Sequence, residues 1–244
     1  MIKIIIHITK FIIAAVTALL FASCNFNMNT IEGSGNVTTE KRTVQGDFKN
    51  IRVSNAIDVV IEQSDSTEIT VEADDNLQKD IETKVENGTL VISCKYNSFR
   101  NITMKKVTVK MPVVDKIEAS SASSVQSKNV IEGQDIILEA SSAASMQVNI
   151  ESDKISVDSG SGSSVTIEGK ALNLNTSVSS GGSIDAAKLM ANDIHAEASS
   201  GGTVSIHPIV SLKAEASSGG NIDYSGSPKT VEKSASSGGN INKS

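Results

Sequence analysis

The sequence predicts an all-β protein: a parallel β-helix, a solenoid of about seven coils of ~19 residues, with an N-terminal β-rich capping region. The main observation is a Ser-rich and Gly-rich phrase, such as EASSGGTV, that returns through the second half of the chain. Each copy ends at one apolar residue, called its anchor here: Val125, Met146, Val165, Ile184, Val204, Ile222 and Ile241. Subtraction gives steps of 21, 19, 19, 20, 18 and 19 residues. Such a constant period is typical of stacked coils, which bury apolar side chains only against neighbouring copies.

Alternation of apolar residues around each anchor indicates β structure. In the third copy, Ile155 and Val157 lie ten and eight residues before the anchor Val165, and Ile167 lies two after it. A period of two residues is that of a strand with one buried face. The repeated glycines argue against helical repeats, since each Gly costs a helix about 1 kcal/mol relative to Ala. We therefore assign residues 113–244 to the β-helix repeats.

A corner of small residues separates the two strand segments of every coil. The fourth residue before the anchor is Ser in all seven copies. The third is Gly in the last five copies, whereas Ala122 and Ala143 take this position in the first two. Ser and Gly favour tight turns, and Gly also permits positive φ or a close approach of two backbones. We expect these special backbone demands mainly in the later coils.

Residues 35–112 are less repetitive but are also rich in strand signals. The expected strands are Phe48–Val53, Ile57–Glu62, Glu68–Glu72, Ile81–Val85, Thr89–Lys95 and Val107–Met111. Asn87-Gly88, between two of them, predicts a hairpin with a type I′ turn, because both central residues of that turn need positive φ. We predict that this region is continuous with the solenoid and covers coil edges that would otherwise pair with another chain.

The first residues have the pattern of a secretion signal. A basic start precedes the apolar run Phe11–Phe21, which is too short to span a bilayer as a mature helix, since spanning takes about 20 residues. The small residues before Cys24 resemble the lipobox of bacterial lipoproteins. This resemblance implies cleavage before Cys24 and a diacylglycerol on its thiol. We therefore assign 1–23 to a lipoprotein signal peptide and 24–34 to a tether, the alternative being an ordinary secretory peptide with a chance Cys.

One column of the repeat concentrates carboxylates and is the candidate cation site. The seventh residue before the anchor is acidic in five copies: Glu118, Glu139, Asp158, Glu197 and Glu215. Stacked like charges about 5 Å apart repel each other unless solvent, a cation or basic neighbours screen them. Lys116, His195 and Lys213 occupy the neighbouring outward column. We therefore favour screening over a calcium stripe and expect neither a metal nor another cofactor.

Catalysis and nucleic-acid binding find little support. Cys94 lies in an alternating strand run with no base close in sequence, which indicates a half-buried strand residue rather than a nucleophile. A polysaccharide-active enzyme would need paired carboxylates with basic or aromatic residues that grip sugars. Asp185 and Asp223 both follow their anchors but are two coils apart, and aromatic residues make up only 3% of the chain. A net charge of −6 without a basic patch disfavours nucleic acid. We therefore expect no catalytic residues and no enzyme.

The chain also resembles a known bacterial family over roughly residues 35–244. The resemblance rests on GSGNVTTEKRTVQGDFKNIRVSNAIDVVIEQ, on ITVEADDNLQKDIETKVENGTLVIS and on the Ser-Ser-Gly-Gly coils that follow. The family is the putative auto-transporter adhesin, head GIN domain family, chiefly from Bacteroidetes. It implies a β-helical fold on secreted or lipid-anchored proteins and, by its name, adhesion. It supplies no catalytic residues that can be carried over.

We therefore expect a noncatalytic cell-envelope lipoprotein that presents its β-helix for binding or adhesion, with an envelope protein or a glycan as partner. The alternatives are an envelope scaffold or sensing component with a protein partner and, third, a polysaccharide-active β-helix enzyme. The lipid would hold the protein at the outer membrane. The periplasmic face is favoured over the cell surface, because no acidic cluster resembling a surface-export tag follows Cys24. Lys233 and Lys243 take inward positions in the final repeat, so we expect a frayed last coil and a monomer.

Overall fold

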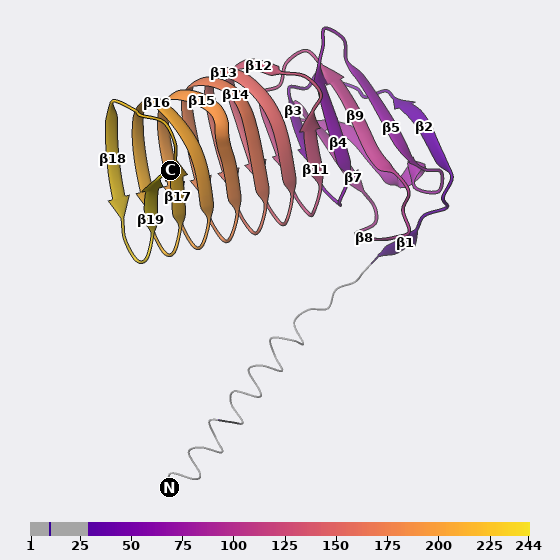
Figure 1. Cartoon of the computed structure of the whole chain (residues 1–244). Coiled ribbons are helices and arrows are strands. Elements are labelled where there is room, and N and C mark those ends of the chain that lie inside the picture. Colours follow the sequence, from indigo (N-terminus) through magenta and orange to yellow (C-terminus); the bar gives the residue numbers. More distant parts are fainter. Residues whose placement is uncertain (1–9, 11–28) are drawn as a thin grey trace.

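A computed structural model describes residue 10 and residues 29–244 (Figure 1). Cys24, and the signal peptide predicted over 1–23 apart from Lys10, lie outside the described residues. Within 29–244 the regular structure is β, apart from one turn of 3-10 helix, η1 (Gln78–Asp80). No helix in the described part of the chain is long and apolar enough to cross a membrane.

The strands fall into two groups along the chain. Those of the N-terminal region are β1 (Thr30–Glu32), β2 (Val37–Arg42), β3 (Asn50–Val53), β4 (Asp58–Gln63), β5 (Glu68–Asp74), β6 (Ile81–Glu86), β7 (Thr89–Cys94), β8 (Ser98–Arg100) and β9 (Lys105–Met111). Those of the repeats are β10 (Lys116–Ala119), β11 (Ser124–Ser127), β12 (Ile131–Ala140), β13 (Ser145–Ser159), β14 (Ser164–Val178), β15 (Ser183–Ala198), β16 (Thr203–Ala216), β17 (Asn221–Tyr224), β18 (Thr230–Ala235) and β19 (Asn240–Lys243).

The second half is a stack of parallel coils, which confirms the predicted β-helix. Each coil contributes one strand segment on either side of its Ser-rich corner, and each segment pairs in parallel with its counterpart in the next coil. The anchors lie opposite one another, from Val125 and Met146 at the start to Ile222 and Ile241 at the end. Figure 1 shows β12 to β19 as a row of stacked turns that runs away from the N-terminal region.

The predicted inward columns form the core. Ile155, Val157, Val165 and Ile167 of the third coil are all buried, and their counterparts in the neighbouring coils are too. Alanine fills several of these positions in the later coils, so the interior is narrow. Two of the polar groups in the core are bonded to each other, since Ser159 Oγ lies 2.9 Å from Ser163 Oγ. Burial of one apolar column against the next is therefore the main contribution that side chains make to the stacking.

Each corner is a type I′ β-turn. Its two central residues, the fourth and third before the anchor, have positive φ in all seven coils. In the fifth coil these residues are Ser200 (φ 49°) and Gly201 (φ 73°). Gly202 N closes the turn by donating to Ser199 O at 2.8 Å. The second central residue also donates its N–H to the corner of the next coil, as Gly201 N does to Ser218 O at 3.2 Å.

The structure corrects the expectation that special backbone demands fall mainly on the later coils. Ala122 and Ala143 have positive φ, 58° and 61°, so the first two coils make the same turn without Gly. The later coils do differ from the first two in a close approach of two backbones. The residue concerned, however, is the second before the anchor and not the third. A Cβ on Gly220 would lie 2.3 Å from Ala198 O, whereas a Cβ on Gly219 would have nothing within 4 Å.

The stack begins one coil earlier than the repeat indicated. β3 and β4 pair in parallel with β10 and β11, which places Val59 opposite Val125. The corner between β3 and β4 also has two residues with positive φ, Asn55 (63°) and Ala56 (53°). β7 and β9 form a further parallel layer on the other side of β3 and β4. The chain therefore forms one coil with β3 and β4, then forms β5 to β9, and continues the stack with β10.

Antiparallel strands cap this end of the solenoid, as predicted. β6 pairs with β7 through the expected Asn87-Gly88 turn, β5 pairs with β9, and β2 covers β5. The two outermost strands carry charged side chains, including the ion pairs Lys41–Glu68 (3.1 Å) and Lys84–Glu86 (3.0 Å). Charges on an edge strand oppose pairing with another chain.

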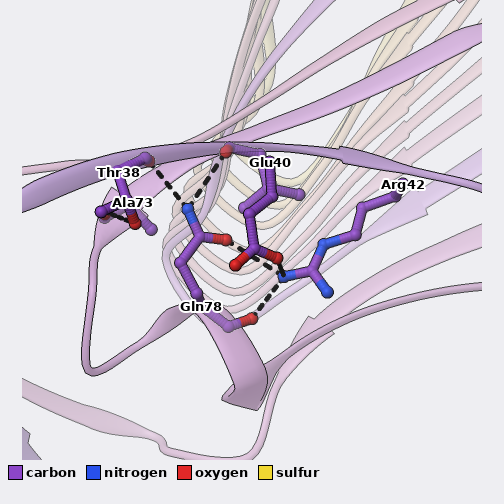
Figure 2. Close-up of polar contacts among 6 residues, drawn as sticks. Thr38, Glu40, Arg42, Ala73 and Gln78 are labelled. Atoms are coloured by element: carbon purple, nitrogen blue, oxygen red, sulfur yellow. Dashed lines mark hydrogen bonds and ion pairs between the residues drawn. The ribbon is translucent and has the colours of Figure 1, made fainter.

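Buried Gln78 fastens β2 to this cap. Figure 2 shows Gln78 Nε2 donating to Thr38 O, at 2.8 Å, and it also donates to Val71 O at 3.2 Å. Arg42 Nη2 donates to the backbone and side-chain oxygens of Gln78 at 2.6 and 3.0 Å and pairs with Glu40 at 3.1 Å (Figure 2). The edge strand is thus held by side chains as well as by its backbone ladder.

The segment expected to be a tether ends in an ordered contact. β1 lies within residues 24–34 and pairs in parallel with β8, with Thr30 opposite Ser98. A few residues later, the buried carboxylate of Asp74 accepts hydrogen bonds from Gly35 N (3.1 Å) and Met104 N (2.9 Å). Asp74 therefore holds the entering chain against the loop that carries β8.

The last coil is formed rather than frayed. β18 and β19 pair in parallel with β16 and β17 over their whole lengths. The side chains of β18 are exposed, and Lys233 Nζ lies 4.5 Å from the ring centroid of Tyr224, over which it packs. Lys233 therefore lies over the ring of Tyr224 at the open end of the stack, in the column where most other coils have an apolar residue.

We predict that Gly220→Ala lowers the melting temperature of the protein more than Gly219→Ala does. A methyl group at residue 220 would press on the carbonyl oxygen of Ala198 in the preceding coil. At residue 219 the methyl group has room and adds only the left-handed backbone penalty, roughly 1–2 kcal/mol. Thermal melts followed by circular dichroism measure both variants. An equal or reversed order would show that close approach does not limit this corner.

Candidate functional site

The acidic column lies along one outer face of the solenoid, and basic side chains interleave with it. Glu118 pairs with Arg52 and with Lys116 (2.6 Å), and Lys116 also reaches Glu139 (2.8 Å). Partial burial opposes ionisation of Glu118, but the hydrogen bonds from Arg52 and Lys116 outweigh it and lower the pKa of this carboxyl. The first carboxylates of the column are therefore neutralised by basic side chains of their own and of adjacent coils.

Of the later carboxylates, Glu215 is paired in the same way, whereas Glu197 lies only near His195. His195 Nε2 lies 3.4 Å from Glu197 and 3.9 Å from Glu215, and Lys213 reaches Glu215 at 2.7 Å. Asp158 differs from the rest, because burial and the neighbouring Glu139 raise its pKa. Within the described residues no group of three or more His, Cys, Asp or Glu side chains is arranged to hold a metal ion. Apart from Asp158 and Glu197, the column therefore consists of carboxylates paired with Arg or Lys side chains.

The two carboxylates weighed for glycan cleavage do not form a pair. Asp185 and Asp223 lie on the outer face of the sheet that carries the anchors, and Ser205 lies between them in register. Asp185 Oδ1 accepts a hydrogen bond from Ala187 N at 3.1 Å. Asp223 instead accepts from the side chain of Asn221 at 2.7 Å. The two groups thus belong to separate hydrogen-bond networks.

A shallow groove of about 770 Å³, which sequence reasoning missed, follows the bend opposite the Ser-rich corners. Leu172, Met190 and Ile209 line it and are 49%, 47% and 42% exposed. Glu132 and Glu151 lie at its other end, in earlier coils. Adjacent exposed apolar side chains often mark contact sites. The sequence did contain a signal for this groove, because these three apolar residues occupy positions outside the inward columns.

Sequence reasoning also missed a buried amine in the cap. Lys105 is 8% exposed, its Nζ donates to Asn55 O at 3.0 Å, and it lies 3.2 Å from the ring centroid of Phe99. Burial lowers the pKa of Lys105 to about 8. Cys94 is a strand residue, as predicted, but its thiol is buried rather than half-buried, and burial raises its pKa, which keeps it protonated and unreactive.

The position of Lys105 explains its burial. In each coil, the backbone oxygen of the fourth residue before the anchor accepts a hydrogen bond from a backbone N–H in the corner of the preceding coil. Ser121 O, for example, accepts from Ala56 N at 2.9 Å. The layer of β7 and β9 has a loop in place of that corner. Lys105 Nζ bonds Asn55 O, which occupies the equivalent acceptor position. The role of this lysine is therefore to complete the first corner.

Lys105→Met should remove a pH-dependent part of the stability. The pKa of Lys105 falls from 10.5 to about 8 on folding, so the unfolded chain binds more protons between these values. Stability of the wild type should therefore rise relative to the variant as pH increases from about 8 towards 10.5. Melts of both proteins across this range measure the difference. A difference that stays constant would contradict the burial of a charged amine.

Comparisons with known proteins identify a family match and similar solved structures for this chain. The family model described as "putative auto-transporter adhesin, head GIN domain" matches residues 47–228. No curated protein matches the chain. Similar solved structures include a "putative adhesin" from Bacteroides fragilis NCTC 9343, with a TM-score of 0.81 and 24% identity. Two others come from Parabacteroides distasonis ATCC 8503: a "putative lipid binding protein" (TM-score 0.73, 22% identity) and a "putative adhesin" (0.70, 26%).

Each of the three alignments covers 88% of this chain and 100% of the other one. The structural likeness shows that the whole described solenoid, cap included, is a shared fold. The family match extends from the loop before β3 to the loop after β17, over 182 (228 − 47 + 1) of the 244 residues. The chain therefore belongs to the family described as the putative auto-transporter adhesin, head GIN domain family.

Proposed function

We propose that this protein is a noncatalytic, lipid-anchored binding protein of the cell envelope whose solenoid presents its faces for adhesion-type contacts. The observation that carries the proposal is the place where the chain enters the fold. β1 joins the cap through β8, at the end of the stack remote from the last coil (Figure 1). With a lipid on Cys24, the six residues to Thr30 reach at most about 20 Å. The cap would then lie near the membrane, and the coils would extend beyond it.

The family and the surface chemistry support binding rather than turnover. The family description and two of the similar structures carry the name adhesin. Several carboxylates of the outer faces are occupied by ion pairs or by hydrogen bonds within the chain, as at Glu118 and Asp185. The partner in this proposal is an envelope protein or a glycan, and the protein itself acts as a monomer at the periplasmic face of the outer membrane.

A scaffold with a protein partner is the second candidate, and the groove along the outer bend favours it. Leu172, Met190 and Ile209 offer apolar contact area in adjacent coils. Protein interfaces bury such residues at their centres. Under this alternative, cross-links to a partner would form at the groove, and no glycan would be retained.

Cys24→Ser should move the full chain from the detergent phase to the aqueous phase in detergent-phase partitioning, with its melting temperature unchanged. Cys24 precedes all described strands, so its replacement removes the lipid without touching the fold. Cys94→Ser is the matched control, because Cys94 is buried in β7 and its loss leaves the anchor in place. Equal partitioning of the wild type and Cys24→Ser would contradict the lipid-anchor proposal.

A further inference from the structure

We propose that the outer face of the anchor-bearing sheet binds an extended, uncharged polysaccharide. This rests on the binding function proposed above and names both the surface and the class of ligand. The surface, called the anchor face here, consists of the residues directly before and after each anchor. Its members are Ser124, Gln126, Ser145, Gln147, Ser164, Thr166, Ser183, Asp185, Thr203, Ser205, Asn221, Asp223, Asn240 and Asn242.

The anchor face is a regular two-dimensional array. Each of its residues lies directly opposite its counterpart in the next coil, through all seven coils, without a register shift. The irregularities in β14, β15 and β16 occur only further along these strands, after the anchor-face residues. Side chains therefore repeat about every 4.8 Å along the stack and about every 6.6 Å along a strand. A polymer that lies along the stack meets the same kind of group at every coil.

The chemistry of this array selects hydroxyl-rich, uncharged ligands. Twelve of the fourteen residues carry a hydroxyl or carboxamide, two carry a carboxylate, and none carries a positive charge. Without Lys or Arg the face offers no charge complementarity to an anionic polymer, and nucleic acids depend on such residues. It also lacks the Trp, Tyr, Met and Arg that are enriched in protein interfaces, and it is rich in Ser, which is depleted there. Hydroxyl and amide groups, by contrast, both donate and accept hydrogen bonds, as sugar hydroxyls do.

Many of these groups are free to bond a ligand. The side chains of Gln126, Gln147, Thr166 and Ser205 are exposed or half-exposed, and none of them bonds another group of the described chain. On the opposite face, by contrast, acidic and basic side chains such as Glu118 and Lys116 engage each other. The anchor face, where only Ser164, Ser183, Asn221, Asp223 and Asn242 bond each other, therefore presents donors and acceptors that the described chain does not use.

The same features set the size of the ligand. Single neutral hydrogen bonds contribute little net free energy in water, and the anchor face has no aromatic ring on which a sugar could stack. One or two sugars would therefore bind weakly. Contacts repeated over several coils add up through effective concentration, so a long chain binds much better than its fragments. This makes an extended polysaccharide, rather than an oligosaccharide, the ligand that fits.

The test uses the full chain in mild detergent and its co-sedimentation with cellulose, curdlan and chitin, which are uncharged. We expect retention on at least one of them, with competition by a soluble uncharged polymer such as dextran or mannan and none by pectate, which is anionic. The double variant Gln147→Ala/Thr166→Val removes neighbouring groups of adjacent coils. It should weaken retention roughly tenfold, the effect of losing one to two neutral hydrogen bonds.

The matched control is Ser156→Ala/Asn175→Ala, which removes polar groups from two adjacent coils on the opposite face. Because these groups lie outside the anchor face, their removal should cost no hydrogen bond to the polysaccharide, and retention should change less than twofold. An equal loss in the two double variants, preference for pectate, or no retention on any uncharged polysaccharide would overturn the assignment. So would a protein partner cross-linked at the Leu172 groove with no glycan retained, although that result would leave a binding function in place. Partitioning of Cys24→Ser reports on the anchor independently of all these outcomes.

Discussion

The hydrogen bond that each corner donates to the next coil is the constraint on which the rest of the structure depends. Gly201 N donates to Ser218 O at 3.2 Å, and the same link recurs from Ala56 to Gly219. In every one of these corners the donor is the second of two consecutive residues with positive φ. Once every corner adopts this turn, the strand segments on both sides are fixed in register, and the apolar columns must meet.

Lys105 shows how strong that constraint is. The layer of β7 and β9 has no corner of its own, and a buried amine with a lowered pKa bonds the acceptor, Asn55 O, that lacks its usual partner. A buried carbonyl without a partner costs more than a neutral hydrogen bond gains. The fold therefore accepts the desolvation of a lysine in order to complete its first corner. At the other end, Lys233 packs over Tyr224 and covers the last core layer.

The parts of the fold that follow from a local period could be predicted from the sequence. The coils and the inward columns were readable because alternation and spacing are properties of neighbouring residues. The coil of β3 and β4 was missed although Val59 has the same pattern around it, because 66 residues (125 − 59) separate it from the anchor Val125. The close approach at Gly220 was assigned to its neighbour, since sequence shows which residues are small but not which carbonyl they face.

The candidate binding surfaces were less predictable for a related reason. The acidic column was visible as a column, but its neutralisation depends on which coil supplies the partner, as when Arg52 from the coil of β3 and β4 meets Glu118. The polar, nearly uncharged character of the anchor face appears only when register aligns seven short segments. What the solenoid offers a ligand is thus decided by stacking, the same interaction that holds it together.

Amide hydrogen exchange at the corners tests this account most directly. The N–H groups of Gly162, Gly181, Gly201 and Gly219 lie in turns at the surface, yet each bonds the next coil. They should exchange slowly. Gly238 occupies the same position in the last coil, where no further coil follows in the described chain, and its N–H should exchange fast. Fast exchange at all five glycines would contradict the claim that the corners tie the coils together.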